Sequence, residues 1–187
     1  MRHSAAMILF SGLLLTPAFS ADWPQFMRDS AHTGNAPDEA LKLPLGQAAQ
    51  VRLDDAIMTT PAVVGDRAYV VDQMGACYAV DPAAGGKILW KSAPDGAPST
   101  SSGRGRAKGS NTSSPSVAGG RVCYGTTAGT VHILDAKDGK VLKTLEIGSP
   151  IVSAVTFASD RFYFQAMDAV VRCIDLGGKE LWTWDHY

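Results

Sequence analysis

Short apolar runs alternate with turn residues along most of the chain, and the pattern returns about every forty residues. Residues 60–81 (TPAVVGDRAYVVDQMGACYAVD) align with residues 114–135 (SPSVAGGRVCYGTTAGTVHILD) at a constant offset of 54. A third copy at residues 155–175 follows at an offset of 40. Repetition at this period is typical of architectures built from stacked, similar units. We therefore expect most of the recurring residues to serve the fold.

Each copy predicts four short strands joined by tight turns, as in Ala62–Val64, Arg67–Val71, Ala76–Val80 and Ile88–Trp90 of the first copy. Gly and Asp at the turns suit the positive φ angles of two-residue hairpins. No stretch after the first twenty residues shows sustained helical periodicity. Because one such unit cannot bury both faces, the sequence predicts an all-β fold, a β-propeller of four-stranded antiparallel blades. About three blades are present, so the predicted propeller is incomplete.

The predicted organisation has three parts. Residues 1–20 form a signal peptide, residues 21–44 an N-terminal lead-in, and residues 45–187 the propeller repeats, with copies at about 57–91, 111–143 and 150–182. A stray strand is expected from about Leu45 to Leu53. A Gly-, Ser- and Pro-rich insertion at 93–111 is expected to be flexible. The insertion is locally basic, with Arg104, Arg106 and Lys108. We expect these side chains to be exposed to solvent and not to bind an anion or a partner.

The first twenty residues predict export. Arg2 precedes an apolar run, Met7–Leu15, and a small-residue pattern ending at Ser20. These are the three parts of a secretory signal peptide. The apolar run is shorter than the roughly 20 residues that a spanning helix needs. We expect a periplasmic or extracellular protein without stable membrane insertion.

Composition and motifs give little support for catalysis. The net charge of −1 does not favour nucleic acid as a partner. No nucleophile elbow or phosphate-binding glycine loop occurs, and we assign no catalytic, cofactor-binding or metal-binding residues. His132 occupies a variable repeat position and is expected to have a structural or surface role in preference to binding a metal or acting as a base. The Asp that closes each third strand is expected to accept hydrogen bonds from turn amides. These residues are Asp81, Asp135 and Asp175.

Three cysteines, Cys77, Cys123 and Cys173, remain in a chain expected to enter an oxidising compartment. An odd number leaves at least one unpaired. No C-x-x-C spacing occurs, and the repeat alignment places Cys77 and Cys173 where the second copy has Val131 and Ile133. We interpret all three as small buried hydrophobic residues in preference to disulfide partners.

The repeat S/T-P-A/S-V-x-G-x-R, G-x-V-x-x-L-D and D-x-x-x-G-K-x-L-W resembles the pyrroloquinoline-quinone-like (PQQ-like) β-propeller family, which includes BamB-type outer-membrane assembly propellers. The lead-in Asp22-Trp-Pro-Gln-Phe26 strengthens the resemblance. In that family the Trp closing each repeat packs between neighbouring blades. Trp90 and Trp182 fit that role, whereas the second copy has Lys143, so one such contact is expected to be missing.

The resemblance implies two functions. One is a non-catalytic exported propeller that binds proteins through a propeller face or an edge strand, without a cofactor. The other is the N-terminal part of a PQQ-dependent alcohol or sugar dehydrogenase, which would use PQQ and calcium. We expect the chain to be an N-terminal fragment of a longer propeller, since remaining blades or self-association are needed to close the ring.

Overall fold

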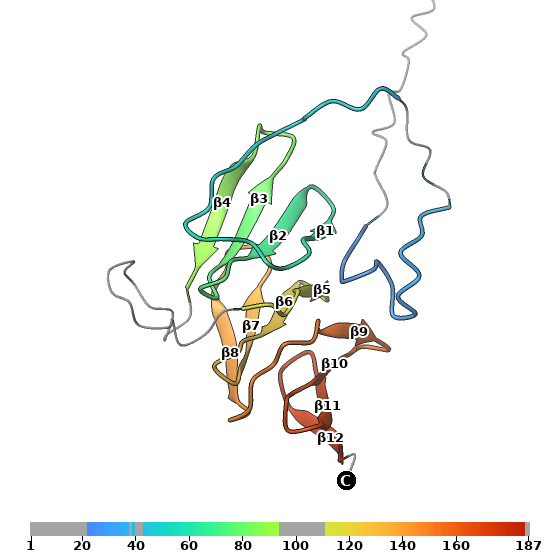
Figure 1. Cartoon of the computed structure of the whole chain (residues 1–187), viewed down its shortest axis with the longest axis vertical. Coiled ribbons are helices and arrows are strands. Elements are labelled where there is room, and N and C mark those ends of the chain that lie inside the picture. Colours follow the sequence, from blue (N-terminus) through green and yellow to red (C-terminus); the bar gives the residue numbers. More distant parts are fainter. Residues whose placement is uncertain (1–21, 38, 40–42, 94–110, 186–187) are drawn as a thin grey trace, which may run out of the picture.

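The computed structural model describes residues 22–37, 39, 43–93 and 111–185. The predicted signal peptide and the basic residues of the insertion lie outside the described residues. Within these ranges the protein is all-β, with three four-stranded antiparallel sheets and no helix, hence no helix able to cross a membrane. Figure 1 shows the three sheets stacked from β1–β4 to β9–β12. The predicted fold class is confirmed as an open stack of three propeller blades.

Each blade is a meander in which consecutive strands pair with one another. The first blade contains β1 (Ala62–Val64), β2 (Arg67–Val71), β3 (Cys77–Asp81) and β4 (Lys87–Ser92). The second contains β5 (Ser116–Ala118), β6 (Arg121–Gly125), β7 (Thr130–Asp135) and β8 (Val141–Glu146). The third contains β9 (Thr156–Ala158), β10 (Arg161–Gln165), β11 (Val170–Asp175) and β12 (Glu180–Asp185).

The repeated turn residues adopt the conformations that the sequence predicts. In the third blade Ser159 and Asp160 take φ angles of 48° and 59°, where the second blade has Gly119 and Gly120 at 54° and 72°. Asp81, Asp135 and Asp175 each accept a backbone hydrogen bond within their own turn, at 3.0, 2.7 and 2.8 Å. These carboxylates fix the turn between the third and fourth strands of every blade.

The core lies between the blades, because each inner strand alternates side chains toward its two neighbours. Cys77 and Ala79 of the first blade pack with Tyr124 and Leu134 of the second. Cys123 and Ile133 of the second blade pack with Phe162, Phe164 and Ile174 of the third. All three cysteines are buried and unpaired, as the sequence predicts.

The strand expected from about Leu45 to Leu53 is absent. Residues 45–53 are extended, yet they pair with no strand among the described residues. Val51 and Leu53 instead pack their side chains on Ala76, Tyr78 and Val80 of the first blade. The segment therefore covers a blade face through side chains alone, because no neighbouring strand in the described chain supplies a hydrogen-bonding partner.

Candidate protein-docking site

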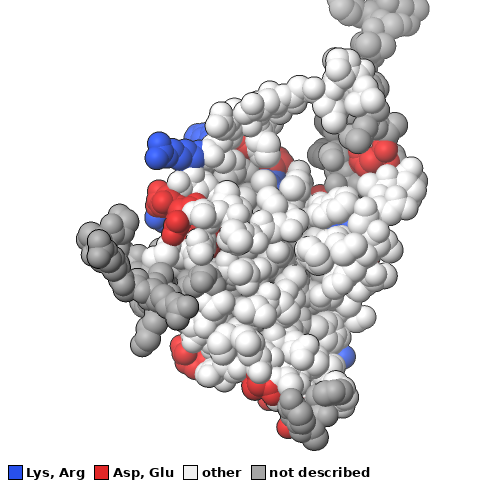
Figure 2. Space-filling model, in the orientation of Figure 1, with Lys and Arg blue, Asp and Glu red and all other residues white. Residues whose placement is uncertain are grey.

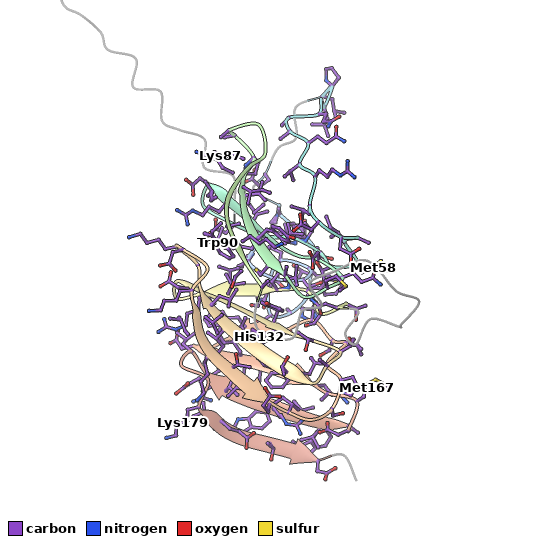
Figure 3. The ribbon with its side chains drawn as sticks, turned by 90° about the vertical axis from the view of Figure 1, so that its left-hand side faces the viewer. Met58, Lys87, Trp90, His132, Met167 and Lys179 are labelled. Carbon is purple, nitrogen blue, oxygen red and sulfur yellow. The ribbon has the colours of Figure 1, made fainter. Side chains whose placement is uncertain are left out.

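The contact between the first two blades centres on one peptide oxygen. The carbonyl of Ala136, in the β7–β8 turn, accepts hydrogen bonds from Trp90 Nε1 at 3.1 Å and Tyr69 Oη at 3.2 Å. The Arg67 guanidinium donates to the same oxygen at 3.1 Å and to the Lys137 carbonyl at 2.9 Å. Figure 3 labels Trp90 where the first blade meets the second. The predicted inter-blade role of Trp90 is confirmed.

A turn glycine makes this close contact possible. A Cβ added at Gly139 would lie 2.5 Å from Cε3 of Trp90, so any larger residue would push the indole away. Between the second and third blades, a Cβ at Gly178 would lie 2.9 Å from Cγ of Lys143. The contact expected to be missing at Lys143 is thus replaced by packing of its aliphatic stem, without the indole hydrogen bond.

The third blade carries the same side chains on its outward face. Tyr163 pairs with Cys173, and Cys173 pairs with Trp182, in the register that joins Tyr69, Ala79 and Trp90 in the first blade. No fourth blade covers this face among the described residues. Trp182 is 43% exposed and Trp184 is 55% exposed. This aromatic face, defined by Tyr163, Val171, Trp182 and Trp184, is the candidate docking site.

The opposite end of the stack is covered by the chain itself. A Cβ at Gly86, the turn glycine of the first blade, would lie 3.2 Å from the Gln50 carbonyl oxygen and 3.3 Å from Cβ of Val51. Gln50 and Val51 therefore pack on the turn glycine of the first blade, Gly86, in the way that Trp90 packs on the turn glycine of the second blade, Gly139. Asp54 extends this cover through an exposed ion pair with Lys91, which lowers the pKa of the Asp54 carboxyl. One end of the stack is capped and the other presents aromatic side chains.

The lead-in holds the innermost strands together. Val63, Val117 and Phe157 are equivalent residues of β1, β5 and β9, and their amides donate to three consecutive residues. Val63 N–H donates to Trp23 O at 2.8 Å, Val117 N–H to Pro24 O at 2.8 Å, and Phe157 N–H to Gln25 Oε1 at 2.5 Å. The sequence of this lead-in indicates only a resemblance to the family, and nothing in the residue pattern around Gln25 predicts that its side chain bonds to β9.

The buried histidine of the second blade has hydrogen-bond partners on its own strand and on β8. His132 lies between Thr130 and Thr144, whose hydroxyls are 3.1 Å from Nε2 and 3.2 Å from Nδ1. Burial lowers the pKa of His132 to about 4, so the imidazole is neutral at pH 7. Figure 3 labels it within the second blade. Burial also raises the pKa of Cys77 and Cys123, which disfavours a nucleophilic thiolate at either position.

The described residues bring together no group of three or more His, Cys, Asp or Glu side chains able to hold a metal ion. The three cysteines lie on different blades, on β3, β6 and β11. Figure 2 shows one face of the molecule with scattered charges and no extended basic patch.

Comparison with solved structures supports the fold. The chain is similar to a quinohemoprotein alcohol dehydrogenase from Pseudomonas putida HK5, with 23% identity and a TM-score of 0.70. That similarity covers 87% of this chain and 26% of the dehydrogenase, so the chain spans about a quarter of the enzyme. BamB from Moraxella catarrhalis is 18% identical with a TM-score of 0.61, covering 77% of this chain and 39% of BamB.

The computationally designed Ika4 protein is also similar, at 20% identity and a TM-score of 0.60, covering 78% of this chain and 82% of Ika4. No curated protein matches the chain. Residues 73–186, more than half of the sequence, match the family described as outer membrane protein assembly factor BamB. The chain belongs to this BamB family of PQQ-like propeller proteins.

Proposed function

We propose that this chain is an exported, non-catalytic propeller protein that binds other proteins through its blades. The observation that carries the proposal is the outward face of the third blade. Trp182 and Trp184 there are exposed, on strands with the register of a buried inter-blade contact. Aromatic residues that are exposed together are a common feature of protein interfaces. The BamB family is described as one of assembly factors, and the signal peptide predicted at residues 1–20 supports export.

Site-specific photo-cross-linking in the native host tests this function. A photo-reactive phenylalanine analogue replaces Trp184 in one variant and Leu142 in another. Leu142 is a matched control because its side chain, on the outer strand β8, is 44% exposed. We expect a discrete protein adduct from position 184 that disappears on adding Trp182→Ala. Equal adducts from both positions, or none from position 184, would contradict protein binding by this face.

The alternative function is the N-terminal part of a PQQ-dependent dehydrogenase. The similarity to the Pseudomonas putida enzyme favours it, since this match has a TM-score of 0.70 against 0.61 for BamB. At 23% identity this similarity concerns the fold. The test is dye reduction by the protein from its native host, supplied with PQQ, calcium and alcohols. Reduction that requires all three would establish the alternative, and its absence would support the non-catalytic function.

A further inference from the structure

At one end of the blades, the loops that enter the innermost strands are bonded to the turns between the second and third strands. In the first blade Gln73 N–H donates to Ala56 O at 2.7 Å, and in the third blade Met167 N–H donates to Pro150 O at 2.8 Å. Asn111 N–H, in the loop that enters the second blade, donates to Gln73 O at 2.7 Å. Backbone hydrogen bonds thus hold loops and turns of neighbouring blades in one fixed surface.

This surface carries large apolar side chains. Four of them are exposed by 47–69% and are named the methionine face: Ile57, Met58, Val152 and Met167. Figure 3 shows its two methionines toward one side of the molecule, and Lys87 and Lys179 toward the opposite side. Exposed apolar side chains that gather on one surface mark an interaction site. The methionine face is separate from the aromatic face, which lies on the outward side of the third sheet.

The chemistry of methionine says what kind of contact this face makes. Met58 is 62% exposed and Met167 is 69% exposed, and neither belongs to a buried cluster of the described chain. A methionine side chain is unbranched, flexible and polarizable, so it adapts to apolar side chains of different shapes. Mounted on a fixed backbone, these side chains suit a polypeptide segment whose apolar residues vary from one partner to another.

The charges that border the methionine face are acidic. The basic side chains of the blades nearest these turns, Lys91 and Arg172, are each ion-paired with an aspartate. Asp55 and Glu146 are exposed and form no ion pair within the described part of the chain. A complementary partner therefore carries Lys or Arg beside its apolar residues. A second copy of this face would set carboxylates against carboxylates.

We propose that the methionine face binds an extended polypeptide segment that carries apolar and basic side chains, and that oxidation of Met58 and Met167 by a peroxide releases it. In the oxidation step the O–O bond of hydrogen peroxide breaks, an S–O bond forms at Sδ, the sulfur loses two electrons, and water leaves. The sulfoxide is polar, so the apolar contact is lost. This function adds a second binding surface and does not depend on the aromatic face.

Fluorescence anisotropy of a labelled peptide of alternating Leu and Lys, titrated with the full chain, tests the binding. Peptides of alternating Leu and Glu, and of alternating Ser and Lys, are the controls for charge and for apolar contact. We expect saturable binding of the Leu–Lys peptide alone. Combining Met58→Gln with Met167→Gln should weaken it about tenfold, because a polar side chain of similar length replaces each thioether. Leu142→Gln is the matched control, since it removes an exposed apolar side chain of β8 outside this face.

The release is tested by treating the full chain with hydrogen peroxide before the titration. We expect a loss of affinity similar to that of the glutamine variant. Met58→Leu combined with Met167→Leu should retain binding and lose the sensitivity to peroxide. Absent binding of the Leu–Lys peptide, equal binding of either control peptide, full affinity of the glutamine variant, or peroxide sensitivity in the leucine variant would overturn the proposal. Self-association that the glutamine variant abolishes would also overturn it, by placing a second copy on this face.

Discussion

The indole nitrogen of Trp90 donates to the carbonyl of Ala136 across the boundary between two blades, at 3.1 Å. The donor belongs to the outer strand of one blade, and the acceptor to a turn of the next. The turn is held by Asp135, and its closing Gly139 leaves room for the indole. The first two blades are thus joined at their periphery by a side chain that donates a hydrogen bond to a backbone carbonyl of the neighbouring blade.

Trp90→Ala should destabilise the fold far more than Trp182→Ala. Trp90 is half-buried and bonded to the next blade, and its removal leaves a cavity and takes away one of the three donors to the Ala136 carbonyl, costing about 3 kcal/mol. Trp182 is 43% exposed, and its removal should cost less than about 1 kcal/mol. Chemical denaturation of both variants measures the difference. Equal losses would refute the docking role of Trp90.

Gly125→Ala should destabilise the second blade by about 1–3 kcal/mol through overpacking. Gly125 ends β6, and an added Cβ would overlap Cγ2 of the buried Ile151. Gly46→Ala is the control, since nothing lies within 4 Å of its added Cβ. Thermal melting of the two variants makes the comparison. A melting temperature of Gly125→Ala equal to that of the unaltered protein would show that Ile151 can move aside.

Gln25→Ala should loosen the third blade from the lead-in. The Gln25 side chain accepts a hydrogen bond from Phe157 N–H and donates one to Phe157 O at 3.3 Å. Its loss leaves the Phe157 N–H and carbonyl without these partners, at a cost of about 1–3 kcal/mol. Hydrogen exchange at the Phe157 amide should accelerate, while the Val63 amide stays protected by Trp23. Gln47→Ala, at an exposed position, is the control. Unchanged exchange at Phe157 would exclude this bridging role.

The sequence predicts the blades well because their signals are local. Turn residues such as Gly119, and the Asp that closes each third strand, act within a few residues of their own position, so a repeat alignment finds them. The lead-in escapes such reasoning, because Trp23, Pro24 and Gln25 contact strands 40 to 132 residues away. A residue that imitates a peptide group with its side chain leaves no periodic pattern.

The error at residues 45–53 has a related physical cause. Alternating side chains predict a strand, and Val51 and Leu53 do face the first blade as strand residues would. A strand also needs a hydrogen-bonding neighbour, and the described chain supplies none there. The aromatic face was also only partly foreseen: Trp182 follows from the repeat, whereas its arrangement with Arg161 and Tyr163 emerges from the register of three strands.

The stability of the protein should fall as the pH drops from about 6.5 to about 4, because of His132. Burial lowers the folded-state pKa of this histidine from 6.5 to about 4. Over that interval the unfolded chain takes up a proton that the folded chain refuses, so the free energy of unfolding decreases, by about 3 kcal/mol in total. Above pH 6.5 the imidazole is neutral in both states and contributes no pH dependence.

His132→Gln is the matched variant, because glutamine can bond to the hydroxyls of Thr130 and Thr144 without titrating in this range. Urea denaturation of both proteins at intervals from pH 7.5 to pH 4 isolates the histidine as the difference between the two curves. The difference should change most steeply midway between the unfolded and folded pKa values, at about pH 5, and level off below pH 4. Parallel curves across the whole range would contradict this prediction. They would mean that the pKa of the imidazole is the same inside the second blade as in the unfolded chain.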